Sequence, residues 1–232
     1  MLAYSNPIIT RTKFLEEIAN HQEQDKIIRG AYWDWNEDRG CAIGCAFSSI
    51  ANISDKLMVP DTRDNHRLLA RYLGIDEELL RVEDFLFENI SIERAKAWPL
   101  EFSSAIQERA DTSRIVLLLV AAVLRNLYAP EHATTPELAT MGRRIADGID
   151  AEWTVGQWLY LRADFPETTD WNPPYRAVNY ILAKLRGETF VRNDALSDFL
   201  YHMAYVRDGS EWMANALLVL LRDAPIGLAE AA

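Results

Sequence analysis

The sequence predicts a mainly α-helical fold, a compact bundle of about ten helices. The chain has 232 residues but only ten Gly and nine Pro, and all-β folds need more turn residues than that. Apolar residues recur at helical spacing, and capping residues stand between the apolar runs. No stretch has the composition of a linker. We therefore expect residues 1–232 to form a single domain, with the weakest candidate for a boundary between two lobes near residues 165–174.

The first elements are a long helix, a non-helical segment and a short buried helix. Thr10 or Thr12 can cap a helix over residues 11–29, and Gly30 is placed to end it. The aromatic-rich segment that follows lacks helical spacing, which predicts a loop or a short hairpin near residues 30–40. Small and apolar residues then predict a short buried helix over residues 41–50.

The later helices begin at capping residues or at a proline suited to a first helical turn. Asp76 is a predicted cap of this kind, and Thr135-Pro136 combines both signals. A glycine, Gly74, is placed to close the helix before Asp76. The remaining helices are expected over residues 66–73, 77–88, 91–98, 99–109, 112–128, 135–149, 152–163, 175–185, 193–206 and 210–222.

Charge and targeting signals exclude several classes of protein. The formal net charge is −11, whereas nucleic-acid-binding domains carry a basic patch, so no nucleic-acid partner is expected. The most apolar run, residues 115–124, is too short for a bilayer, which needs about 20 residues, so no membrane partner is expected. With no signal peptide and two cysteines, the sequence predicts a cytoplasmic protein.

The two cysteines, Cys41 and Cys45, are the first candidates for chemistry. A metal site needs about four ligands, and the chain's four His form no metal-binding pair, so no metal or cofactor is expected. A thiol at a helix N-terminus gains a lowered pKa and becomes nucleophilic. His66 would then be the candidate base, and Glu83 or Asp84 the orienting carboxylate. The alternative, that both cysteines are small buried residues, stays open.

The aromatic segment is the second candidate site. Tyr32, Trp33 and Trp35 stand close together, and Arg39 follows them. Such a cluster is either a hydrophobic plug beneath the helices or an exposed edge that recognises a partner. The second interpretation makes another protein the expected partner, and it leaves a homo-oligomer open.

Three motifs carry a resemblance to a known family. They are the G-C-A-I-G-C segment at Gly40–Cys45, the V-E-D-F-L-F-E segment at Val82–Glu88, and the W-P-L-E-F segment that begins at Trp98. In this order they are similar to a family of uncharacterised bacterial and phage-borne proteins, over roughly residues 1–150. The family has no established activity. The resemblance implies that the cysteine segment, the acidic pair and the Trp-Pro step belong to one recurring constellation.

The sequence therefore leaves two hypotheses for function. The first is a non-enzymatic protein-interaction module of bacterial or phage accessory genomes, which the lack of a catalytic motif, the acidic balance and the aromatic segment favour. The second is a cysteine-dependent enzyme or a thiol redox sensor that uses Cys41 or Cys45.

Overall fold

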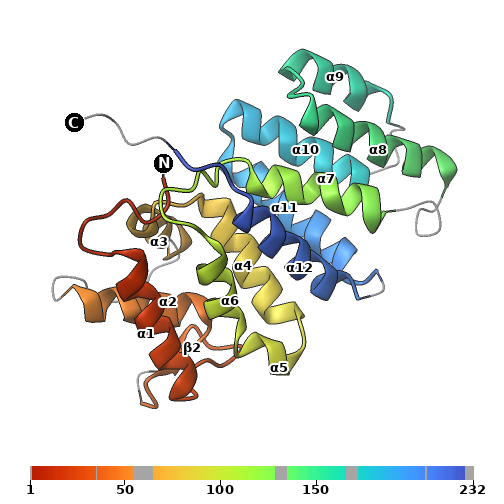
Figure 1. Ribbon diagram of the computed structural model, residues 1–232. Helices are drawn as coiled ribbons and strands as arrows, with labels where there is room; N and C mark the ends of the chain where they lie inside the picture. The colour runs from red at the N-terminus through yellow and green to blue at the C-terminus, as the bar shows by residue number, and fades with distance from the viewer. Residues whose placement is uncertain are drawn as a thin grey trace. The chain divides into compact units, whose positions relative to one another are not determined.

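The computed structural model describes residues 2–34, 36–54, 65–128, 135–165, 172–206 and 208–227. Within them the chain is mainly helical, as predicted, with twelve α-helices and one two-stranded sheet (Figure 1). The helices are α1 (Arg11–Glu23), α2 (Ala42–Ile53), α3 (Asn65–Leu73), α4 (Glu77–Asn89), α5 (Ile92–Ala95), α6 (Trp98–Ala105), α7 (Ile115–Asn126), α8 (Pro136–Asp150), α9 (Val155–Ala163), α10 (Pro173–Arg186), α11 (Thr189–Ala204) and α12 (Gly209–Arg222).

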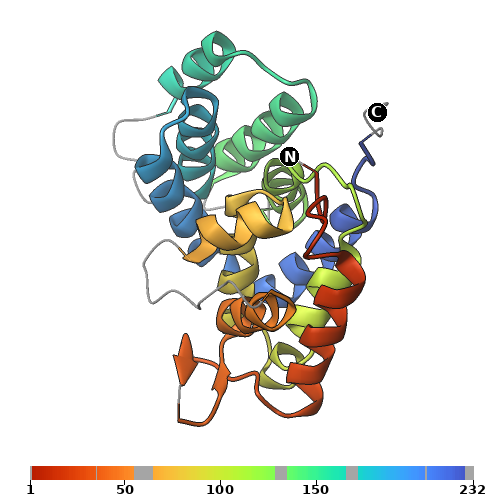
Figure 2. The same ribbon diagram turned by 90° about the vertical axis from the view of Figure 1, so that its left-hand side faces the viewer.

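The predicted hairpin is confirmed as a minimal antiparallel sheet. Strand β1 (Trp33–Asp34) pairs with β2 (Arg39–Gly40), with Trp33 opposite Gly40. Figure 2 shows the two strands side by side next to the start of α2. The hairpin therefore leads directly into the helix that carries both cysteines.

The chain divides into two compact units by its internal contacts. Unit 1 comprises Met1–Ile115 and Leu217–Ala232, and unit 2 comprises Val116–Ala216. The C-terminal segment belongs to unit 1 because Ile226 forms a bridge with Ala110. The boundary expected near residues 165–174 falls mostly on residues 166–171, which lie outside the described residues.

Helix starts follow the predicted caps. The Thr10 Oγ1 accepts a hydrogen bond from the Lys13 amide at 3.5 Å, and the Asp76 Oδ1 accepts one from the Glu78 amide at 2.9 Å. The Thr135 side chain caps α8 in the same way. These side chains satisfy amide groups that have no partner within the first helical turn.

The first helix ends earlier than predicted. We expected it to reach residue 29, but α1 ends at Glu23 and Asp25 adopts a positive φ of 53°. Residues 20–26 have no apolar side chain to bury, so continued helix there would gain little from packing. The chain instead forms backbone hydrogen bonds with the hairpin, from the Ile28 amide to the Gly40 carbonyl and from the Gly40 amide to the Lys26 carbonyl, both 2.9 Å.

Each unit has a core of its own. In unit 1, helices α1, α2, α4 and α6 pack around Phe14, Phe87 and Trp98, which are almost fully buried. In unit 2, α10 packs against α8, α9 and α11 around Trp158 and Tyr180. None of the described helices combines the length and the apolar character that a bilayer crossing requires.

Candidate functional site

Both cysteines lie at the start of α2 and are buried. Cys41 is the N-cap residue and is 7% exposed, and Cys45 follows in the first turn with no exposed surface. Burial raises the pKa of each thiol to about 12, because a thiolate would lose its hydration there. A nucleophilic cysteine needs a lowered pKa and access to solvent. At neutral pH both side chains are therefore protonated thiols, free of a disulfide.

Close packing explains the glycines of this segment. A Cβ atom on Gly40 or Gly44 would overlap the backbone carbonyl oxygen of Tyr32. The Cys41 amide donates to the Ala31 carbonyl at 2.8 Å, and the Cys45 thiol donates to the Gly40 carbonyl at 3.4 Å. The two glycines of the G-C-A-I-G-C pattern thus allow the backbone at Tyr32, just before β1, to lie directly against the first turn of α2.

His66 and Asp84 form a pair that links α3 to α4. The His66 Nε2 lies 3.2 Å from the Asp84 Oδ2, and both side chains are partly buried. The negative charge of Asp84 contributes to the raised pKa of Cys41, although burial is the larger cause. Among the described residues, neither thiol is hydrogen-bonded to His66, so the structure brings together the predicted base and carboxylate but does not join the nucleophile to them.

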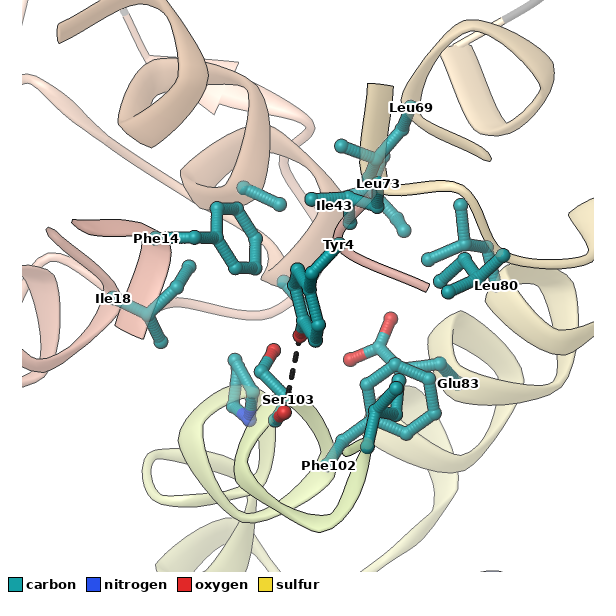
Figure 3. Close-up of a pocket in the computed structure, with 15 residues that line it drawn as sticks. Tyr4, Phe14, Ile18, Ile43, Leu69, Leu73, Leu80, Glu83, Phe102 and Ser103 are labelled. Atoms are coloured by element: carbon teal, nitrogen blue, oxygen red, sulfur yellow. Dashed lines mark hydrogen bonds between the residues drawn. The ribbon is translucent and has the colours of Figure 1, made fainter. Parts of the chain in front are cut away.

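Glu83 is a buried carboxyl group inside unit 1. It is 3% exposed, and Figure 3 shows its carboxyl group directed towards the ring of Tyr4 in an apolar pocket. Burial, with smaller contributions from Asp84 and Glu88, raises the pKa of Glu83 well above its ordinary value. Its Oε2 has no hydrogen-bond partner among the described residues. Burial therefore favours the neutral, protonated form of Glu83, which makes it a poor charged partner for a base.

The pocket around Glu83 is nearly filled. The remaining cavity has a volume of about 10 Å³, which suits one water molecule and is too small for an organic substrate. The Trp98 Nε1 donates to the backbone carbonyl of Glu83 at 3.2 Å. The acidic pair and the Trp-Pro step of the sequence thus meet in the core of unit 1.

Two residues of this core escaped the sequence analysis. Tyr4 is buried, and its hydroxyl donates to the Ser103 carbonyl at 3.0 Å, the contact marked in Figure 3. Arg29 donates from Nε to the Phe87 carbonyl at 2.9 Å, at the end of α4. The partners of both side chains are distant in sequence, so no local signal identifies these contacts.

The described hairpin aromatics pack against helices. The Tyr32 ring lies 6.5 Å from that of Phe47, and the Trp33 ring lies 6.1 Å from that of His21, between ring centroids. Arg39 is half-exposed and pairs with Glu37. Trp35 lies outside the described residues. These contacts favour the hydrophobic plug over an exposed recognition edge for Tyr32 and Trp33.

Unit 2 carries an exposed aromatic pair that the sequence analysis did not single out. Tyr201 is 54% exposed and Tyr205 is 72% exposed. Their rings lie 4.8 Å apart in an edge-to-face arrangement, and their hydroxyl groups are 3.1 Å apart. The sequence signal that could have identified this pair is its spacing, since two tyrosines four residues apart, outside the apolar face of a helix, lie next to each other on its surface.

Comparison with known proteins identified no similar protein. No protein-family model, curated protein or solved structure matches the chain. Its function must therefore be argued from the described residues themselves.

Proposed function

We propose that the chain is a non-enzymatic protein-interaction module of bacterial or phage accessory genomes, and that it binds its partner through the Tyr201–Tyr205 pair. The observation that carries the proposal is the exposure of two tyrosines in edge-to-face contact at the end of α11. The assignment to bacterial or phage genomes rests on the three motifs of the first 150 residues.

Exposed, paired tyrosines have the properties of an interface anchor. A tyrosine buries a large area on binding, and its two side-chain torsions cost little entropy to fix. Tyrosine is also enriched at the energetic centres of protein interfaces. The contact between Tyr201 and Tyr205 holds both rings in a defined arrangement before any partner arrives, which reduces the cost of ordering them.

The chemistry around the thiols favours binding over cysteine catalysis. A cysteine nucleophile must reach substrate as a thiolate, whereas burial raises the pKa of both Cys41 and Cys45 to about 12. The hydrogen bond from Cys45 to the Gly40 carbonyl gives that thiol a packing role. We therefore prefer the interaction module to the enzyme or redox sensor.

The proposal can be tested by site-specific crosslinking in cells that naturally express the chain. The photocrosslinker p-benzoylphenylalanine is placed at position 201 or 205, and, as the matched control, at position 160, where Tyr160 is 69% exposed on α9. We expect a discrete crosslinked protein product from positions 201 and 205 but not from 160. Absence of a product at both 201 and 205, or the same products at all three positions, would overturn the proposal.

A further inference from the structure

The carboxyl group of Glu83 faces a small internal cavity in unit 1, which we call the Glu83 cavity. Its volume is about 10 Å³, and every residue that lines it is described and buried. Glu83 is 3% exposed, and its Oε2 has no hydrogen-bond partner among the described residues. A buried polar atom without a partner has lost the hydrogen bonds that it makes with water in the unfolded chain. The cavity is the space in which a partner for this oxygen can bind.

Three polar side chains stand among the apolar residues of the lining, those of Tyr4, Glu83 and Ser103 (Figure 3). The Tyr4 hydroxyl donates its one proton to the Ser103 carbonyl at 3.0 Å, so its oxygen is left as an acceptor. The Glu83 carboxyl group accepts hydrogen bonds in either protonation state, and its neutral form also donates one. The lining therefore suits a guest that can both donate and accept hydrogen bonds.

The size and the chemistry of the Glu83 cavity select water as this guest. A single water molecule needs roughly 10–15 Å³ of such space and about two to four polar partners. A hard metal ion needs about six oxygen ligands, whereas the lining holds a single carboxyl group. Among the described residues, no group of three His, Cys, Asp or Glu could hold a metal ion. Water satisfies the Glu83 oxygen at a small entropic cost.

The N-terminal segment covers the Glu83 cavity on the side of Tyr4. The Tyr4 amide donates to the Leu73 carbonyl at 2.7 Å, and the Ala3 amide donates to the Ala110 carbonyl at 2.9 Å. Together with the hydroxyl contact to Ser103, these bonds hold the buried Tyr4 side chain in place. A water molecule in the cavity can leave only when this segment or a neighbouring helix opens locally. It should therefore stay bound far longer than water on the surface.

We infer that unit 1 binds one internal water molecule in the Glu83 cavity, hydrogen-bonded to the Glu83 carboxyl group. The water gives the unpartnered oxygen of α4 its hydrogen bond and adds a polar contact beneath the N-terminal segment. This inference concerns the core of unit 1 and is independent of the proposed function, which rests on the tyrosine pair of α11.

The test measures the oxygen-17 relaxation dispersion of water in solutions of the full chain. This signal reports long-lived bound water and is insensitive to exchanging hydroxyl protons. The parent chain is compared with Glu83→Val, which has nearly the same volume without a polar atom, and with Glu83→Gln, which keeps a donor and an acceptor. Glu93→Gln is the matched control, because Glu93 is an exposed carboxylate on α5. We expect Glu83→Val to lose the contribution of one water molecule, and both Gln variants to keep it.

Nuclear Overhauser effects from water to methyl groups of the lining place the bound molecule. Ile43, Ala46 and Leu80 supply such methyl groups. We expect these effects in the parent chain and in Glu83→Gln, and their loss in Glu83→Val. Their absence in the parent chain would overturn the inference, as would their persistence in a folded Glu83→Val variant. Loss of the water in a folded Glu83→Gln variant would also overturn it, because that side chain retains the hydrogen-bonding groups on which the site depends. If Glu83→Val does not fold, the parent chain and Glu83→Gln decide the result.

Discussion

Glu83 should make the stability of the chain fall as pH rises, and its replacement by Gln should remove that dependence. Glu83 is 3% exposed, and its carboxyl pKa is raised well above the ordinary value, chiefly by burial. The folded state therefore holds this proton at pH values where the unfolded state has released it. In that range the unfolded state binds fewer protons, so the free energy of unfolding decreases with increasing pH.

The size of this pH dependence follows from the release of a single proton, that of Glu83. The ordinary pKa of a Glu carboxyl is 4.5. The stabilisation that the bound proton of Glu83 gives the folded state is therefore complete below pH 4.5. It is lost between that pH and the raised pKa that Glu83 has in the folded state. For each pH unit inside this interval the free energy of unfolding should fall by up to about 1.4 kcal/mol. Gln has nearly the same shape and does not titrate, so the Glu83→Gln variant should become progressively more stable than the parent chain over the same interval.

Urea unfolding at constant ionic strength, from pH 5 to pH 8, measures this difference. The control is Glu93→Gln, which removes an exposed carboxylate from the neighbouring helix α5, and its free energy of unfolding should change with pH in nearly the same way as that of the parent chain. The reasoning is refuted if the free energies of the parent chain and of Glu83→Gln change in parallel across this range.

Two further predictions concern the start of α2. Gly44→Ala should lower the unfolding free energy by about 1–3 kcal/mol, because its Cβ meets the Tyr32 carbonyl, whereas Gly156→Ala, whose nearest neighbour would be 3.9 Å away, should be neutral or stabilising; equal melting temperatures for the two variants would contradict this packing. Cys41 and Cys45, with thiol pKa values of about 12, should react with iodoacetamide at pH 7 only after denaturation. Rapid alkylation of the native chain at that pH would restore the thiol hypothesis.

The fold was predictable wherever the signal was local. The caps Thr10, Asp76 and Thr135 could be identified because a capping residue and the amides that it satisfies lie within a few positions of each other. The end of α1 could not, because it depends on hydrogen bonds with the distant Gly40. The return of the C-terminal segment to Ala110 is likewise a tertiary contact without a local pattern.

The candidate site was only partly predictable for the same reason. The sequence placed Cys41 and Cys45 together at a helix start, and it drew attention to Glu83. Whether a thiol or a carboxyl group is activated or merely buried depends on how other helices cover it, and that is decided by tertiary packing. The exposure of Tyr201 and Tyr205 is also a tertiary property, since helical spacing marks a shared face but not whether a neighbour covers it.

The central claim, binding through the tyrosine pair and not catalysis by a thiol, is tested most directly by partner recovery with two variants. The partner identified by crosslinking is then quantified by its co-purification with the unlabelled parent chain, with Tyr201→Leu combined with Tyr205→Leu, and with Cys45→Ala, each first shown to be folded. We predict that the paired Leu variant loses the partner and that Cys45→Ala retains it. Loss of the partner in Cys45→Ala with full recovery in the paired Leu variant would contradict the account.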